Sequence, residues 1–211
     1  MDTDRLQLER GFLVRWVLAS AIGLLIGFTG YFILVVGFSP EQGFIQKALI
    51  SAVGGGFFGV AVGGMQMFVL RSEVSEMNHW MLVNLVGGTI GGVVALPLAE
   101  AAGDAMGFNM AVFAGGIVLG LSLGIAQVVI LNNVLNGSGW WVLAHTVGIP
   151  LGWVLGRGLG ESIHNLILGG LEEGMVQVIA NVIVIILFFG GYGLITGGVL
   201  TWLLNRKNKS I

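Results

Sequence analysis

The feature that most constrains the fold is a stretch of sequence that occurs twice. Residues 59–87 read GVAVGGMQMFVL, a short polar run and WMLVNLVG, and residues 120–148 read GLSLGIAQVVIL, a polar run and WVLAHTVG. The two copies align without a gap at an offset of 61 residues. The identical pairs include Gly59 and Gly120, Gly63 and Gly124, Gln66 and Gln127, Leu70 and Leu131, Trp80 and Trp141, and Gly87 and Gly148. Matches at one offset indicate an internal repeat, so we expect one structural unit to occur more than once.

Each copy consists of two apolar segments, and the whole chain has the composition of a membrane protein. Of its 211 residues, 55% are hydrophobic and 9% are charged, whereas soluble domains carry roughly a quarter of charged residues. Most of the apolar runs are long enough for a helix to cross a hydrocarbon layer of about 30 Å. They cover 12–36, 44–70, 80–99, 110–131, 140–155 and 176–204. We therefore predict an all-α integral membrane protein with six transmembrane helices.

The distribution of basic residues predicts the orientation in the membrane. Six spans place both termini on one side, and if that side is inside, only Lys47 and Arg157 lie outside. The other basic residues are then cytoplasmic: Arg5, Arg10, Arg15, Arg71, Arg206, Lys207 and Lys209. Because Lys and Arg are retained on the cytoplasmic side, we predict a multi-pass protein of the cell inner (plasma) membrane with both termini cytoplasmic.

The first and last apolar runs extend the repeat to three units. Trp16, Ser20 and Gly23 have the spacing of Trp80, Asn84 and Gly87, while 193–204 continues the series of the two copies with Leu200 in place of glutamine. We therefore predict three pseudo-equivalent two-helix hairpins, 12–70, 80–131 and 140–204, in a single domain covering 1–211. Because like surfaces pack best when a closed rotation relates them, we expect a pseudo-threefold axis along the membrane normal.

Tryptophans begin the three outward-running helices of this topology. Trp16, Trp80 and the pair Trp140 and Trp141 take these places, and Trp202 lies near the matching end of the last helix. Indoles are favoured at the boundary between lipid and water. We therefore expect these side chains at the level of the inner headgroups.

Glycines recur every four residues within the predicted helices. The rows are Gly55, Gly59 and Gly63, then Gly116, Gly120 and Gly124, then Gly148, Gly152, Gly156 and Gly160. Such rows make flat helix faces, which let backbones approach in a lipid environment that offers no hydrophobic gain for helix association. The two outer connections, 100–109 and 156–174, are predicted to be longer than the others. The second could include a short interfacial helix around 159–167.

Five polar side chains fall at a similar depth just inside the predicted cytoplasmic interface. Three follow the repeat tryptophans by four residues and two precede the inner ends of inward-running helices: Ser20, Asn84, His145, Gln66 and Gln127. Polar groups in hydrocarbon need partners, so one interpretation is hydrogen bonding between helices. The other is a layer that lines a narrow opening or binds a polar ligand, with His145 able to change charge.

Acidic residues gather at the predicted outer side. Glu100 matches Glu161 at the repeat offset, and Asp104 follows Glu100 by four residues on one helix face. Glu172 and Glu173 add further charge. We interpret these residues as a solvated outer acidic rim, in which Arg157 can pair with Glu161. The alternative is an acidic vestibule that concentrates cations.

The sequence offers little support for a metal site or for catalysis. Residues 76–79 and 161–164 both read Glu-x-x-His, which occurs in dinuclear iron bundles, but the topology places them on opposite sides. We therefore predict no metal site. The chain contains no cysteine, and no catalytic triad order or phosphate-binding motif is visible. A single histidine could ligate a haem or a chlorophyll, so the cofactor stays unknown, and we expect no enzymatic activity.

The hairpin pattern resembles that of a group of uncharacterised polytopic bacterial membrane proteins. The residues that carry the resemblance are Gly120-x3-Gly124-x2-Gln127-x3-Leu131, followed by Trp141-x6-Gly148. The resemblance covers about residues 16–204 and implies the same repeated hairpin fold. Its motifs are packing motifs, so it implies no particular activity.

These patterns favour a non-enzymatic membrane subunit or scaffold. The abundant glycine faces and the scarcity of charge within the spans suggest contact with other membrane proteins or self-association, in addition to membrane lipids. No basic stripe indicates a nucleic-acid partner. The alternative is a small channel or transporter whose path passes the five polar side chains near the cytoplasmic side.

Overall fold

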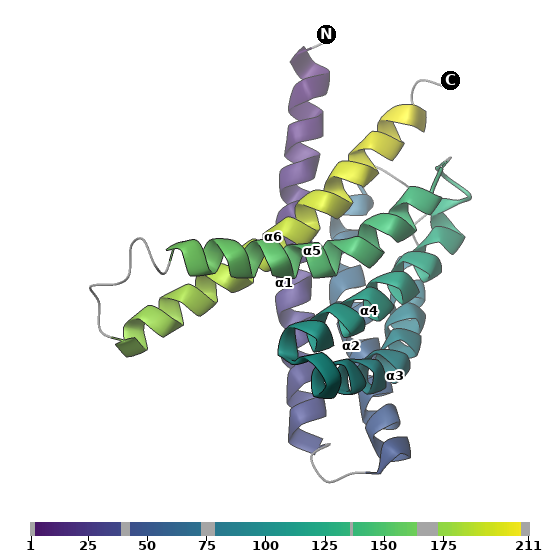
Figure 1. The fold of residues 1–211 in the computed structure, drawn as a ribbon. Helices are drawn as coiled ribbons and strands as arrows, with labels where there is room; N and C mark the ends of the chain where they lie inside the picture. The colour runs from purple at the N-terminus through teal and green to yellow at the C-terminus, as the bar shows by residue number, and fades with distance from the viewer. Residues whose placement is uncertain (1–2, 39–42, 73–78, 136, 164–172, 208–211) are drawn as a thin grey trace.

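The computed structural model describes residues 3–38, 43–72, 79–135, 137–163 and 173–207, and all regular structure in these ranges is helical. The helices are α1 (Thr3–Phe38), α2 (Phe44–Leu70), α3 (Trp80–Met106), α4 (Phe108–Leu131), α5 (Gly139–Ile163) and α6 (Glu173–Lys207) (Figure 1). Each of the six contains a segment of at least 21 residues that is long and apolar enough to cross a membrane. The prediction of an all-α chain with six such helices is confirmed.

The outer connections differ from the prediction. The chain at 100–109 is not a loop: α3 continues to Met106, and only Gly107 separates it from α4. The four alanines within 99–105 favour a helix. Gly107 ends it with φ at 87°, a conformation that suits glycine. In the second connection α5 continues to Ile163, so 159–163 forms the end of α5, and the rest of the expected interfacial helix lies outside the described residues.

The helices pack in chain order, and the last returns to the first. Each helix contacts the next along the chain, and α6 also contacts α1, so the contacts form a closed ring. In Figure 1 the start of α1 and the end of α6 lie at one end of the bundle, and the end of α5 and the start of α6 project sideways from the other helices. The ring brings together six faces around a common interior.

Glycines are found where the backbones approach most closely. A Cβ atom on Gly59 would overlap the carbonyl of Asn84, and one on Gly88 would overlap the carbonyl of Gly55, so α2 and α3 are in backbone contact. At the equivalent place between α4 and α5, a Cβ on Gly120 would overlap the carbonyl of His145. The glycine rows were predicted to let helix backbones approach closely, and these contacts show such an approach. Only a residue without a side chain permits it.

The contact between α6 and α1 is shifted relative to the other two. Gly59 and Gly120 face Asn84 and His145, which are equivalent to Ser20 in the repeat, but Gly193 faces Val17. Val17 lies three residues before Ser20, and the difference is about one helical turn. The α6–α1 contact therefore keeps the close packing of the repeat but changes which side chains meet.

We expect substitution of Gly59 by alanine to destabilise the bundle, because the added methyl group has no room against α3. Overpacking of this kind costs about 1–3 kcal/mol. Gly64 on the same helix is the matched control, since a Cβ there meets no atom within 4 Å. Unfolding by detergent titration should show a clear loss for Gly59→Ala and a change below about 1 kcal/mol for Gly64→Ala. Equal effects of the two changes would contradict the packing role of Gly59.

Candidate functional site

The structure brings the five predicted polar side chains into the interior of the bundle. Ser20, Gln66, Asn84, Gln127 and His145 have no exposed surface, and they come from α1, α2, α3, α4 and α5 respectively. A sixth fully buried polar side chain, Thr196, comes from α6. Each helix thus contributes one member to this set, which we call the polar belt.

Gln127 is the centre of the hydrogen bonds within the polar belt. Its Nε2 atom donates to Asn84 Oδ1 at 2.7 Å and makes a longer contact with Gln66 Oε1 at 3.4 Å. Its Oε1 atom accepts from the indole Nε1 of Trp141 at 2.6 Å. Asn84 in turn donates to the carbonyl of Trp80 at 2.8 Å. One amide therefore links side chains of α2, α3 and α5 to α4.

Thr196 replaces the glutamine that the third hairpin lacks. The indole Nε1 of Trp16 donates to Thr196 Oγ1 at 3.1 Å, as Trp141 donates to Gln127, and Thr196 donates to the carbonyl of Tyr192 at 2.9 Å. Thr196 precedes Leu200, the repeat position of the missing glutamine, by four residues, which matches the shift of about one turn between α6 and α1. The sequence analysis missed Thr196, although its hydroxyl stands where the other copies have Val62 and Leu123.

The repeat tryptophans do not lie at the lipid surface, as the sequence had led us to expect. Trp16, Trp80 and Trp141 are fully buried, and the ring of Trp141 contacts those of Trp16 and Trp80 at centroid distances of 5.7 and 6.4 Å. Only Trp140 and Trp202 are exposed, at 56% and 39%. Two of the three buried indoles, Trp16 and Trp141, donate to the polar belt, and the ring of Trp141 packs against the other two.

Apolar clusters lie on both sides of the polar belt. Towards the termini, the three indoles pack with buried leucines, among them Leu70, Leu131 and Leu200. Towards the opposite end, a second cluster includes Leu24, Phe58 and Phe188. Phe28 joins this second cluster through ring contacts with Phe58, Phe188 and Phe189, at 4.9 to 5.9 Å between centroids. In this conformation the polar belt is enclosed between two layers of hydrocarbon and aromatic side chains.

Not every polar atom in this interior has a partner. Within the described residues, five buried atoms make no hydrogen bond: Ser20 Oγ, Gln66 Nε2, Trp80 Nε1, His145 Nε2 and Tyr192 Oη. Tyr192 was not among the predicted site residues, because it has no counterpart in the repeat pattern. A buried polar atom without a partner is energetically unfavourable in a protein interior, so these five atoms mark the places where hydrogen bonding inside the bundle is incomplete.

The predicted acidic rim is only partly visible. Glu100 forms an ion pair with Lys47 at 3.0 Å, which joins α3 to α2, and Asp104 is exposed on α3. The side chains of Glu161 and Glu173, and the whole of Glu172, lie outside the described residues, so the expected Arg157–Glu161 pair stays a prediction. The Lys47–Glu100 pair is partly exposed, and such a pair typically contributes less than about 1 kcal/mol. Among the described residues, no cluster of three His, Asp or Glu side chains could hold a metal ion.

A second buried polar link joins three helices near the Lys47–Glu100 end. The hydroxyl groups of Tyr31 on α1 and Ser51 on α2 are 2.9 Å apart, and Ser51 donates to the carbonyl of Gly92 on α3 at 2.6 Å. The sequence analysis missed both side chains. Ser51 precedes the glycine row that starts at Gly55 by four residues, so its place on the packed helix face could have been predicted. Tyr31 does not belong to the repeat, so no pattern in the sequence indicated it.

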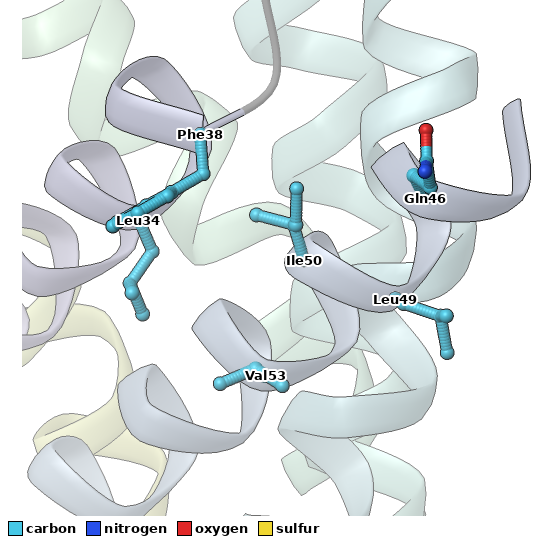
Figure 2. A pocket seen from close by; sticks show the side chains of 6 residues that line it. All are labelled: Leu34, Phe38, Gln46, Leu49, Ile50 and Val53. Carbon is cyan, nitrogen blue, oxygen red and sulfur yellow. The ribbon is translucent and has the colours of Figure 1, made fainter. Parts of the chain in front are cut away.

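The surface near this end carries an apolar hollow of about 500 Å³ between α1 and α2 (Figure 2). Its walls are formed by Leu34, Phe38, Gln46, Leu49, Ile50 and Val53. Five of these six side chains are hydrocarbon or aromatic, so the hollow suits a hydrocarbon chain better than a polar substrate. The lining contains no acid, base or nucleophile.

We expect Gln127→Met to destabilise the protein by about 1–3 kcal/mol, because it leaves the Trp141 Nε1 donor and the Asn84 Oδ1 acceptor without a partner at nearly constant volume. Val129→Met is a control on the same helix, since Val129 is 65% exposed, and it should change stability by less than about 0.5 kcal/mol. Detergent unfolding measures both. If Gln127→Met were neutral, the central role of this amide would be wrong.

Comparison with known proteins identifies no relative. No protein-family model matches the chain, and no curated protein or solved structure shows significant similarity to it. The resemblance to uncharacterised polytopic bacterial membrane proteins therefore stays a prediction.

Proposed function

We propose that this protein is a non-enzymatic, membrane-embedded subunit or scaffold that packs against other membrane proteins. The observation that carries the proposal is the enclosure of the polar belt: its six side chains have no exposed surface and lie between two apolar clusters. In this arrangement Gln127 bonds side chains of three other helices, and Thr196 on α6 accepts from Trp16 on α1. A transport path would instead need them to face an aqueous route.

We further infer that the three hairpins are related by an approximate threefold axis. The closed ring of helix contacts supports this inference, as do three equivalent glycines that each face the second helix of their own hairpin. Gly23 faces Val62, Gly87 faces Leu123, and Gly148 faces Tyr192 and Thr196. The shifted α6–α1 contact is a departure from the symmetry that leaves the order of the helices unchanged.

The predicted orientation can be tested by labelling, because the chain contains no native cysteine. We expect an impermeant maleimide to label Asp104→Cys in intact cells and to label Ser72→Cys only after the membrane is permeabilised. Both positions are exposed, so a difference in labelling reports the side of the membrane. The reverse pattern would invert the topology, and labelling of both in intact cells would contradict the six-span arrangement.

The face of α6 around Gly198 is where we expect a partner helix to bind. Gly198 is exposed, and a Cβ atom added to it would meet no other atom within 4 Å. Together with Val199 and the indoles of Trp140 and Trp202, it lines a hollow of about 270 Å³. A small residue at the floor of such a hollow lets another helix approach closely. Arg206 lies over the ring of Trp202 at 4.0 Å, so the hollow has a cationic edge.

Gly198→Leu should abolish co-purification of the partner in mild detergent, because the leucine side chain fills the hollow. Gly64→Leu is the matched control, since Gly64 is equally free of neighbours but lies on α2. Affinity purification with quantitative mass spectrometry measures retention of the partner, and both variants should fold like the parent. Loss of the partner with Gly64→Leu alone would place the contact elsewhere, and a protein that purifies without any stoichiometric partner would contradict the scaffold proposal.

The purified protein can also be used to test the rival function, a channel or transporter. We expect proteoliposomes that contain the protein to leak ions and small solutes no faster than protein-free vesicles. If flux is seen, and if it disappears when His145 and Asn84 are replaced by leucine, the polar belt conducts and the proposal of a scaffold is wrong.

A further inference from the structure

The apolar hollow between α1 and α2 lies next to the place where these two helices pack directly on each other. A Cβ atom on Gly27 would overlap the ring of Phe58, and one on Gly54 would overlap the ring of Tyr31. The hollow of about 500 Å³ is lined by residues that follow Tyr31 on α1 and precede Gly54 on α2 (Figure 2). It therefore lies between the ends of the two helices that the α1–α2 connection joins.

The hollow follows the direction of the helices and has one polar end. Its lining residues on α2, Gln46, Leu49, Ile50 and Val53, have the i, i+3, i+4 and i+7 spacing of a single helix face. Seven residues span about 10 Å along a helix axis. Gln46 lies in the first turn of α2, at the edge of the apolar span Phe44–Leu70. The hollow thus has a polar group at the edge of the span and hydrocarbon side chains further in.

The lining favours a flexible hydrocarbon chain over another helix. None of its six residues is a glycine, alanine, serine or threonine, the small residues that let helix backbones approach closely in lipid. The hollow at Gly198 differs in this respect. Phe38, Leu49 and Val53 are 61–65% exposed, and in a bilayer this exposed surface meets lipid tails. A chain that lies in the hollow contacts two helices instead of one, which adds dispersion contacts.

The charges near the polar end favour no particular headgroup. Lys47, which follows Gln46, forms an ion pair with Glu100 at 3.0 Å, so its charge is already balanced. Gln46 accepts from the N–H of Gly43 at 3.3 Å through Oε1, and its amide nitrogen carries two donors that suit an ester or phosphate oxygen. Such oxygens occur in phospholipids of either headgroup charge. Binding should therefore depend on the hydrocarbon chain.

We propose that the hollow between α1 and α2 binds one acyl chain of a membrane phospholipid, on the side of the bundle away from the termini. The chain lies along Leu34, Ile50 and Val53, with its ester end near Gln46. The hollow is formed by α1 and α2, whereas the surface proposed for a partner helix is on α6 near the C-terminus. This lipid site is therefore independent of the scaffold function.

Val53→Trp tests the lipid site, because an indole at this position fills the hollow. Val129→Trp is the matched control, since both valines are 65% exposed but Val129 lies on α4, outside the hollow. The full-length protein is released from nanodiscs of palmitoyl-oleoyl phosphatidylcholine in native mass spectrometry, and the retained phospholipid is counted. The parent and Val129→Trp should keep one phospholipid, and occupancy should fall about tenfold in Val53→Trp. Leu34→Trp, which fills the hollow from α1, should have the same effect as Val53→Trp.

Nanodiscs of palmitoyl-oleoyl phosphatidylglycerol separate the chain from the headgroup. The chains are the same and the headgroup is anionic, so retention by the parent should stay within about twofold. Retention that requires the anionic headgroup would overturn the proposal. So would a parent protein that keeps no phospholipid, or unchanged retention in Val53→Trp and Leu34→Trp. A structure in the same nanodiscs with a protein helix in the hollow would also contradict it.

Discussion

Close contact between helix backbones is the interaction on which the rest of this structure depends. In a bilayer, apolar side chains gain nothing by leaving lipid for one another, so association relies on dispersion and on hydrogen bonds between helices. Here α2 and α3 meet through Gly55, Gly59 and Gly88, and α4 meets α5 through Gly120. Side chains at these positions would hold the helices apart, and the interior would lose its other contacts.

The polar belt is possible only because the helices are so close. Gln127 reaches Asn84, Gln66 and Trp141 on three other helices, and these distances require the approach that the glycines allow. In return, the hydrogen bonds define the register in which the flat faces meet, since smooth faces alone can slide along one another. The α6–α1 contact shows this coupling: a shift of about one turn accompanies the use of Thr196 in place of a glutamine at 200.

The buried tryptophans also combine close packing with hydrogen bonding. An indole offers a large apolar surface and one donor, so Trp16 and Trp141 fill the interior and also satisfy acceptors of the belt. Their burial explains why a rule for surface tryptophans failed at these positions. Trp140, adjacent to Trp141, is exposed, because successive residues of an α-helix are rotated by about 100° around its axis.

Much of the architecture could be predicted from sequence because it depends on apolar runs and on the spacing of residues along single helices. The apolar runs predicted six helices that could span a membrane, and the repeat offset selected the polar positions that the structure places in the interior. The connection at 100–109 was predicted wrongly, because Glu100 and Asp104 are as compatible with a polar loop as with the end of an alanine-rich helix. Tyr192 and Thr196 were missed because neither follows the repeat, and a single tyrosine or threonine in an apolar helix has no distinctive spacing.

Spacing along single helices was enough to predict the number of helices, their glycine faces and which polar positions form one set. Only the tertiary structure decided which of those side chains meet, because partners on different helices depend on the register between them. That register placed Thr196 against Trp16, buried three tryptophans together and left Gln66, Tyr192 and His145 each with an atom that has no partner.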